Sequence, residues 1–214
     1  MQPLPVDQFG ELLATPGVLE HCELRDTHVG FMAIHGGLEA TTFEIAKVAA
    51  DRSEASLYAV TQPDELRWHV PSHRYTRDSS PHLDAVCAHV DLVISLHGYG
   101  GVRDSDERWT TVLLGGSNRE VAAALATQLR WALPMYTFID DLDSIPAQYR
   151  GVHDQNPVNQ PKRGGVQIEL PPRIRGNSPM WDGADRDEHG FVEHTQLLVG
   201  TLHLFAGSCS ADSA

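Results

Sequence analysis

The chain has few cysteines, few basic residues and no long hydrophobic run. Of its 214 residues only three are cysteine, and Cys22, Cys87 and Cys209 form no C-x-x-C pair. An odd, scattered set of this kind argues against a disulfide framework and favours buried free thiols or a reducing compartment. No run approaches the roughly 20 apolar residues of a membrane span. The first thirty residues lack the basic start and apolar stretch of a signal peptide, so we expect a cytoplasmic protein without a membrane partner.

Basic residues are outnumbered by acidic ones. There are 16 Lys and Arg against 29 Asp and Glu, which gives a formal net charge of −13. This balance argues against nucleic acid as a partner, because phosphate recognition requires clustered Lys and Arg. It would also repel an anionic substrate at long range unless a local basic patch offsets it. The length suits one domain with its own core, and we expect a monomer with residues 1–207 as that domain and 208–214 as a flexible tail.

Strand-like and helical patterns alternate along the chain. Apolar runs typical of strands occur at 27–34, 56–60, 90–96, 109–114, 136–139 and 165–170. Most are apolar at both alternating positions, as expected for strands covered on two faces. The fold class that this alternation predicts is α/β, with one mixed sheet between layers of helices.

Helix boundaries are marked by capping residues. Thr41 with Glu44, and Ser117 with Glu120, match the capping-box pattern, and Ser80-Pro81 places proline at a first helical position. A last helix is expected over 194–206, ended by Gly207. Three long irregular segments are expected to form the rim of a site, namely 71–81, 140–164 and 171–190.

Two histidines and two carboxylates end, or closely follow, apolar runs. His35 and His97 each end such a run and precede a glycine, and Glu39 lies four residues after His35. Glu169 lies inside the apolar run 165–170. Ligands collect at strand ends in open α/β sheets. Two imidazoles and a carboxylate form a three-point zinc site with an open fourth position, where a further carboxylate can act on bound water.

Each of these residues also has a purely structural interpretation. His97 can be a histidine hydrogen-bonded at a strand end, and a lone His-x-x-x-Glu is weak evidence for a metal. Glu44 is a rival ligand to Glu39, but its place in a capping box explains it. Glu169 requires a partner or a function if a sheet encloses it, whereas on an edge strand it would face solvent.

Several short blocks, taken together and in order, resemble the poly-γ-glutamate hydrolase family, a compact relative of the zinc carboxypeptidases. The blocks are His35-Gly-Gly-Leu-Glu39 continuing into 42–46, then 68–72, 95–98, 114–119, 156–159 and 164–170. The resemblance implies that His35, Glu39 and His97 bind zinc, that Glu169 is the general base and acid, and that an eight-stranded mixed sheet lies between helices. In this chain the carboxylate comes one residue earlier than in the family's His-Gly-Gly-x-x-Glu spacing.

Arg119 is the residue that we expect to bind a substrate carboxylate and support catalysis. With Asn118 it falls in a first helical turn, where free N–H groups and the helix dipole favour anions. Its guanidinium can bind a carboxylate in two-pronged geometry, and the Asn-Arg pair looks like the carboxylate-binding pair of zinc carboxypeptidases. The alternative is a solvated arginine at a helix start. Further candidates for a basic, substrate-binding lip are His69, Arg74 and Arg175.

The expected function is therefore a zinc-dependent hydrolase of amide bonds in γ-linked glutamyl or similar acidic peptides. Two alternatives remain open. One is a zinc amidase or peptidase that acts on cell-wall peptides or N-acyl amino acids. The other is a non-catalytic metal-binding domain of the same fold.

Overall fold

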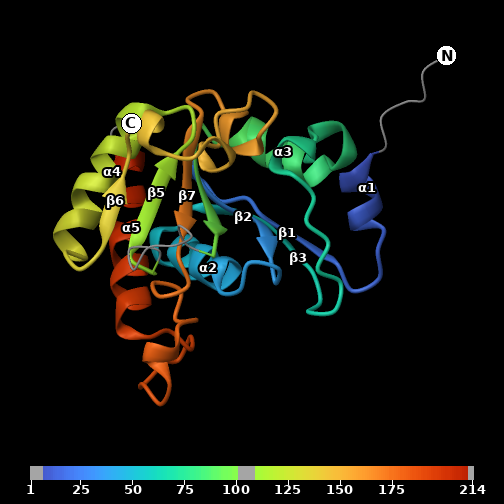
Figure 1. The fold of residues 1–214 in the computed structure, drawn as a ribbon. Helices are drawn as coiled ribbons and strands as arrows, with labels where there is room; N and C mark the ends of the chain where they lie inside the picture. The colour runs from blue at the N-terminus through green and yellow to red at the C-terminus, as the bar shows by residue number, and fades with distance from the viewer. Residues whose placement is uncertain (1–6, 101–108, 212–214) are drawn as a thin grey trace.

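A computed structural model describes residues 7–100 and 109–211 (Figure 1). The strands in these ranges are β1 (Leu19–Glu23), β2 (Val29–Gly36), β3 (Ser56–Thr61), β4 (Leu92–Gly98), β5 (Thr111–Gly115), β6 (Thr137–Ile139) and β7 (Gly165–Leu170). The α-helices are α1 (Gln8–Leu13), α2 (Thr42–Ser53), α3 (Pro81–His89), α4 (Arg119–Ala132) and α5 (Glu193–Ala211). Short 3-10 turns punctuate the longer connections, among them η1 (Ser72–Arg74) and η5 (Ala147–Tyr149).

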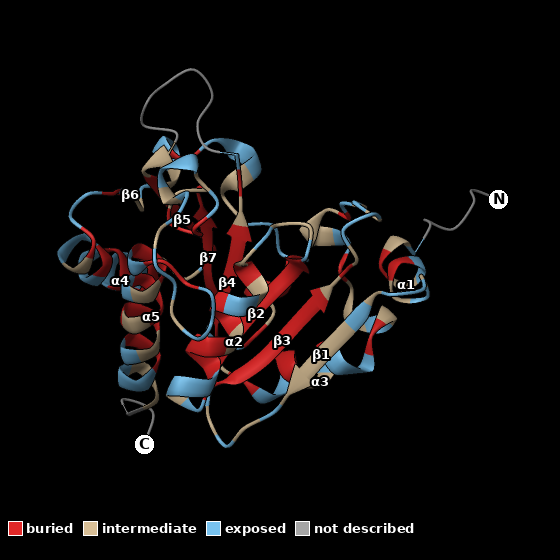
Figure 2. Ribbon diagram, turned by 90° about the horizontal axis from the view of Figure 1, so that it is seen from below, coloured by how far each residue is buried: buried red, intermediate tan, exposed pale blue. Residues whose placement is uncertain are grey.

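The strands form one mixed sheet in the order β1-β3-β2-β4-β7-β5-β6. Strands β3, β2, β4 and β7 run parallel, whereas β1 pairs antiparallel with β3 and β5 pairs antiparallel with β7. The predicted mixed α/β sheet is therefore confirmed, with seven strands in the described residues where the resemblance predicted eight. The central strands are buried along their length, as Figure 2 shows, so Glu169 on β7 does not lie on an edge strand.

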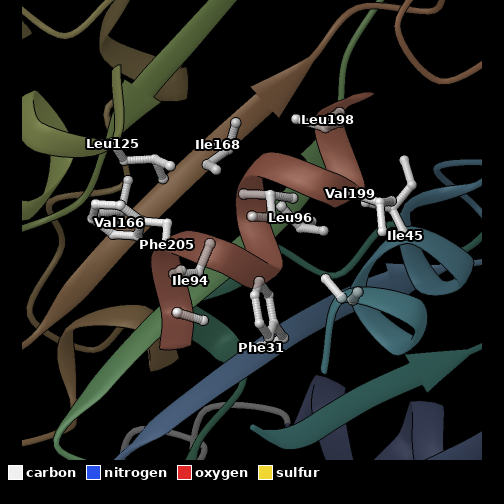
Figure 3. Packing of buried hydrophobic residues seen from close by; sticks show 14 of the residues in the cluster. Phe31, Ile45, Ile94, Leu96, Leu125, Val166, Ile168, Leu198, Val199 and Phe205 are labelled. Atoms are coloured by element: carbon white, nitrogen blue, oxygen red, sulfur yellow. The ribbon is translucent and has the colours of Figure 1, made fainter. Parts of the chain in front are cut away.

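Helices cover both faces of the sheet. On one face α2, α4 and α5 pack on alternate strand residues such as Phe31, Ile94 and Ile168, all fully buried (Figure 3). On the other face α1 and α3 pack on a second cluster that includes Met32 and Val93. Each such side chain contributes about 1.5–3 kcal/mol by leaving water, so the two clusters hold the central strands rigidly.

Three predicted helix ends are corrected by the structure, and one is confirmed. Thr41 has φ 75° and makes no side-chain cap, and Asn118 rather than Ser117 caps α4 by accepting a hydrogen bond from the N–H of Val121. Ser80 caps α3 as predicted, through the N–H of Leu83. Helix α5 continues through Gly207 to Ala211. The expected tail therefore begins as helix, and its last three residues lie outside the described ranges.

Two elements near the start of the chain were not predicted. Strand β1 has the sequence Leu-Glu-His-Cys-Glu, which contains no apolar run, and the strand is only partly buried. It forms by pairing with β3 at the sheet edge. Helix α1 is a six-residue segment held by the Asp7 cap. None of the helices in the described ranges combines the length and apolar character that a membrane span requires.

Candidate active site

A polar stripe crosses two parallel central strands on the face opposite α2, α4 and α5. In β4 and β7 the residues in register are Ser95 with Gln167 and His97 with Glu169. Their alternating neighbours Ile94, Leu96, Val166 and Ile168 belong to the core on the other face. Because side chains alternate along a strand, the sequences of β4 and β7 bring one imidazole and one carboxylate side by side at their carboxyl ends.

His35 reaches the same place from β2 through an irregularity in the strand. Phe31 and Ala33 pack in the core beneath α2 and α5, and strict alternation would send His35 there too. The pairing with β3 shifts register between Ala33 and Gly36, and the His35 ring instead lies 5.0 Å from that of His97. A bulge of this kind re-aims a side chain beside a site.

The tight turn after His35 depends on Gly37. Its φ is 80°, and a Cβ there would lie 2.2 Å from the carbonyl oxygen of Gln62. The turn closes with a 2.9 Å hydrogen bond from the N–H of Glu39 to the carbonyl of His35. It thereby brings Glu39 back over the end of β2.

His35, Glu39 and His97 converge into one cluster. The Glu39 carboxylate lies 3.0 Å from His35 Nδ1 and 3.4 Å from His97 Nδ1, and it accepts a 2.8 Å hydrogen bond from the N–H of Gly98. One ligand atom from each of the three residues lies within 4.8 Å of the others, as a shared metal ion requires. The four-residue spacing between His35 and Glu39 is therefore compatible with one shared metal site.

The far nitrogens of both imidazoles have protein partners. His35 Nε2 donates to the carbonyl of Val70 at 2.9 Å, and His97 Nε2 lies 3.2 Å from Ser95 Oγ. Both rings are almost fully buried, so these contacts fix their orientation. Metal-binding histidines are held by such second contacts, which leave the opposite nitrogen to the ion. Here that nitrogen is Nδ1 in both residues.

The Glu39 carboxylate and the His97 imidazole each shift the pKa of the other toward its charged form. Burial tends to raise the pKa of Glu39, but the neighbouring His35 and His97 outweigh burial and hold that pKa well below its usual range. For His97 burial tends to lower the pKa, whereas Glu39 raises it and prevails. The site therefore favours an ionised carboxylate, which is the form that binds a metal.

Glu169 is the second carboxylate of the site and has a different environment. Only 5% of its surface is exposed. Its Oε1 accepts a 2.8 Å hydrogen bond from Gln167 Nε2, and Gln167 Oε1 accepts another of 2.8 Å from Asn156 Nδ2. This buried chain of amides fixes the orientation of the carboxylate. Arg175, also buried, lowers the pKa of Glu169 without contacting it, and thus partly offsets its charge.

Burial is the largest influence on Glu169 and raises its pKa to about 7, with Glu39 adding to the rise. The ordinary value is 4.5. A carboxylate with a pKa near neutrality is suited to accept and return a proton at physiological pH. The two acids of the site thus differ sharply: the pKa of Glu39 is held well below its usual range, whereas that of Glu169 is raised.

This difference predicts a pH-dependent effect on stability in the metal-free protein. Because the folded-state pKa of Glu169 is raised, its ionisation destabilises the fold; the penalty is absent below pH 4.5 and complete above about pH 7. Replacing Glu169 by Gln should therefore raise the free energy of unfolding by on the order of 2–3 kcal/mol at pH 8.5 but hardly at pH 4.5. Urea unfolding with a chelator present, at both pH values, measures this. An equal change at both would contradict it.

The cluster opens into a cavity of about 870 Å³. The loops around it include parts of the predicted rim segments 71–81 and 140–164, whereas segment 171–190 contributes nothing to its lining. His69 lies in the wall, with its ring 4.5 Å from that of His35. Burial lowers the pKa of His69, and His35 lowers it further. A volume of this size lies within the usual range of pockets that bind small molecules, and it leaves room for a small peptide.

Arg119 and Asn118 lie outside the cavity lining and have other partners. The Arg119 guanidinium donates to the carbonyls of Gly116, Leu114 and Asp140, the second of these at 2.9 Å. Asn118 caps α4 and donates to the carbonyl of Arg163. These hydrogen bonds hold the start of α4 against the ends of the neighbouring strands. The structure therefore does not place Arg119 and Asn118 next to the carboxylates of the cluster.

Arg175 and Arg74 are likewise absent from the cavity wall. The Arg175 guanidinium is 7% exposed and donates to the carbonyls of Leu170, Ala40 and Tyr99. It packs so closely behind Gly98 that a Cβ there would lie 2.7 Å from its central carbon. Its role here is to join three segments and to place a positive charge behind the site.

Gln167 and Asn156 fall within blocks of the family resemblance, but the sequence analysis assigned them no role in the site. The signal for Gln167 was its position two residues before Glu169, on the same face of the strand. The role of Asn156 has no local signal, because its contact with Gln167 depends on how the loop 150–159 folds back over β7.

Comparison with known proteins gives a family and several similar folds. The family model described as poly-gamma-glutamate hydrolase matches residues 16–196. A structure of bacteriophage poly-gamma-glutamate hydrolase superposes with a TM-score of 0.71 at 18% identity, covering 91% of this chain and 90% of that one. A structure described as YndL in a zinc-free apo form gives 0.70 at 23% identity, covering 88% and 89%.

A more distant likeness is to N-acetylmuramoyl-L-alanine amidase from Clostridium difficile 630. Its TM-score is 0.50 at 9% identity, over 88% of this chain and all of that one. Among curated protein sequences none matches. The likenesses to solved structures establish the fold, and the family model, which covers most of the chain, establishes descent. The chain belongs to the poly-γ-glutamate hydrolase family.

Proposed function

We propose that the protein is a zinc-dependent hydrolase that cleaves amide bonds in γ-linked glutamyl or similar acidic peptides. The observation that carries the proposal is the convergence of His35, Glu39 and His97 beside Glu169 at the floor of one cavity. Membership of the family and the size of the cavity both support it.

The donor set suits zinc. Two imidazole nitrogens and one carboxylate oxygen are a common catalytic zinc set, and three protein ligands leave a position for water or substrate. Both rings have their Nε2 engaged, so Nδ1 of His35 and His97 would bind the ion together with Glu39. The similar structure described as zinc-free is consistent with a zinc protein of the same fold.

Zinc, when bound, would lower the pKa of a coordinated water and polarise the scissile carbonyl. Glu169 would take a proton from the attacking water and deliver it to the leaving amine, because its pKa lies near neutrality and it faces the cluster. Gln167 keeps the carboxylate in one orientation through a 2.8 Å hydrogen bond. The buried positive charge of Arg175 favours the ionised form of Glu169 between proton transfers.

Zinc content and substrate choice test the proposal together. We expect about one zinc ion per chain, and hydrolysis of γ-linked polyglutamate that is at least tenfold faster than hydrolysis of α-linked polyglutamate or of a peptidoglycan stem peptide. Metal analysis by mass spectrometry and chromatography of the products measure both. Zinc-loaded protein that cleaves the stem peptide fastest would favour the amidase alternative. Zinc-loaded protein that cleaves none would favour the non-catalytic domain.

A further inference from the structure

The cavity wall differs in charge from the rest of the molecule. The chain carries 29 acidic residues. Yet within the described residues the only carboxylates that line the cavity are Glu39 and Glu169, both of which belong to the site. The remaining ionisable side chains of the wall, apart from tyrosine and the proposed metal ligands, are basic: Arg67, His69, His73 and His153. In a protein of net charge −13, this wall combines one permanent positive charge, on Arg67, with imidazole N–H donors, which an anionic substrate requires.

His73 and His153 form a pair across the cavity wall. His73 lies in η1 and His153 in the loop after η5, and their ring centroids are 4.9 Å apart with planes inclined by 31°. Neither ring has a carboxylate within ion-pair distance in the part of the chain that the structure describes. Nδ1 of His153 accepts a 3.1 Å hydrogen bond from the N–H of Gln155, which leaves Nε2–H as a donor.

The pair is therefore short of negative charge. Burial lowers the pKa of His73, and the neighbouring charges of His153 and Arg74 lower it further. Arg67 on the same wall adds a further positive charge. A carboxylate bound beside the two rings would accept a hydrogen bond from an N–H of each and would raise the lowered pKa of His73.

Arg67 lines the cavity and has a strained backbone. Its φ is 42°, a left-handed conformation that is uncommon outside glycine. The buried side chain of Gln62 holds the next residue, accepting from the N–H of Trp68 at 2.8 Å and donating to its carbonyl at 3.1 Å. This clamp fixes the chain immediately after Arg67. Strain maintained in this way points to a functional position.

We propose that Arg67, His73 and His153 form the subsite that selects an acidic substrate by binding a free carboxylate of a residue next to the scissile amide. This inference rests on the proposed function and supplies its substrate recognition. In a γ-linked glutamyl chain every residue keeps its α-carboxylate free. A guanidinium binds such a carboxylate through charge-assisted hydrogen bonds, and the imidazole N–H groups add further donors to it. The subsite takes the role that the sequence suggested for Arg119.

Binding to a matched pair of oligomers tests the subsite without requiring turnover. One oligomer is a γ-linked glutamate pentamer with free α-carboxylates, and the other is the same chain with α-carboxamides. Titration calorimetry at pH 6.5 uses zinc-supplemented protein that carries Glu169→Gln, with and without the triple change Arg67→Gln, His73→Asn and His153→Asn. The matched control is Arg52→Gln, which removes one exposed charge on α2.

We expect the triple variant to bind the carboxylate pentamer on the order of tenfold or more weakly, with little change for the carboxamide. The Arg52 control should bind both as the parent does. Equal losses for both oligomers, or no loss for either, would overturn the subsite. The proposed function is tested separately by turnover. If the parent enzyme cleaved the carboxylate and the carboxamide oligomers equally well, the proposed function would stand and the subsite would be overturned. If the protein bound the carboxylate pentamer selectively but did not cleave it, the subsite would stand and the proposed function would be overturned.

Discussion

Replacing Glu169 by Gln is expected to leave zinc bound and to reduce kcat on a γ-linked glutamyl substrate by roughly 10²–10⁴-fold. The amide keeps the shape of the side chain, and its oxygen can still accept the hydrogen bond from Gln167. It cannot accept a proton from water or return one to the leaving amine. The metal cluster does not include Glu169, so zinc affinity should change little.

The measurement is steady-state turnover together with zinc content for the same preparation. Glu44→Gln is the matched control, because it removes one carboxylate charge from an exposed position on α2, five residues beyond Glu39. The control should keep full activity. Turnover within a factor of about two of wild type in Glu169→Gln would remove this residue from the mechanism.

Replacing His97 by Ala is expected to abolish both zinc binding and activity. Loss of a second-contact residue alone typically costs 10–100-fold in metal affinity, so the loss of a ligand should weaken zinc binding by more than about 100-fold. The change also removes one of the two imidazoles that hold the pKa of Glu39 below its usual range. The remaining imidazole and carboxylate offer only two ligand atoms.

Zinc affinity is measured by competition with a chromophoric chelator. His82→Ala is the matched control, since His82 is an exposed histidine on α3, outside the cluster. It should bind zinc as wild type does. If His97→Ala retained wild-type affinity, the ion would be held elsewhere. Glu169→Gln should therefore lose turnover but keep zinc, whereas His97→Ala should lose both.

Much of the candidate cluster, His35, Glu39, His97 and Glu169, could be predicted from the sequence because it depends on short-range patterns. Alternation in 93–98 and 165–170 places His97 and Glu169 on one face, and two glycines after His35 predict the turn that returns Glu39. The bulge in β2 that re-aims His35 could not be predicted, since it arises from the pairing of β2 with β3 rather than from any local residue pattern.

The contacts of Arg119, and the pairing of His73 with His153, could not be predicted from the sequence, for a physical reason. Arg119 follows a helix-start pattern, but the pattern does not reveal that three carbonyls already use its donors. His73 and His153 are 80 residues apart and meet only because two irregular loops fold over the same strand ends. Such contacts depend on the tertiary fold, whereas strand alternation depends on the backbone alone.

The most direct test of the central claim is an anomalous diffraction measurement at the zinc absorption edge on crystals of the zinc-loaded protein. We expect one strong peak in the cavity, about 2.0–2.2 Å from Nδ1 of His35, Nδ1 of His97 and a carboxylate oxygen of Glu39, with Glu169 beside it but not bound to it. A peak at another cluster, or coordination that bypasses any of the three ligands, would contradict it.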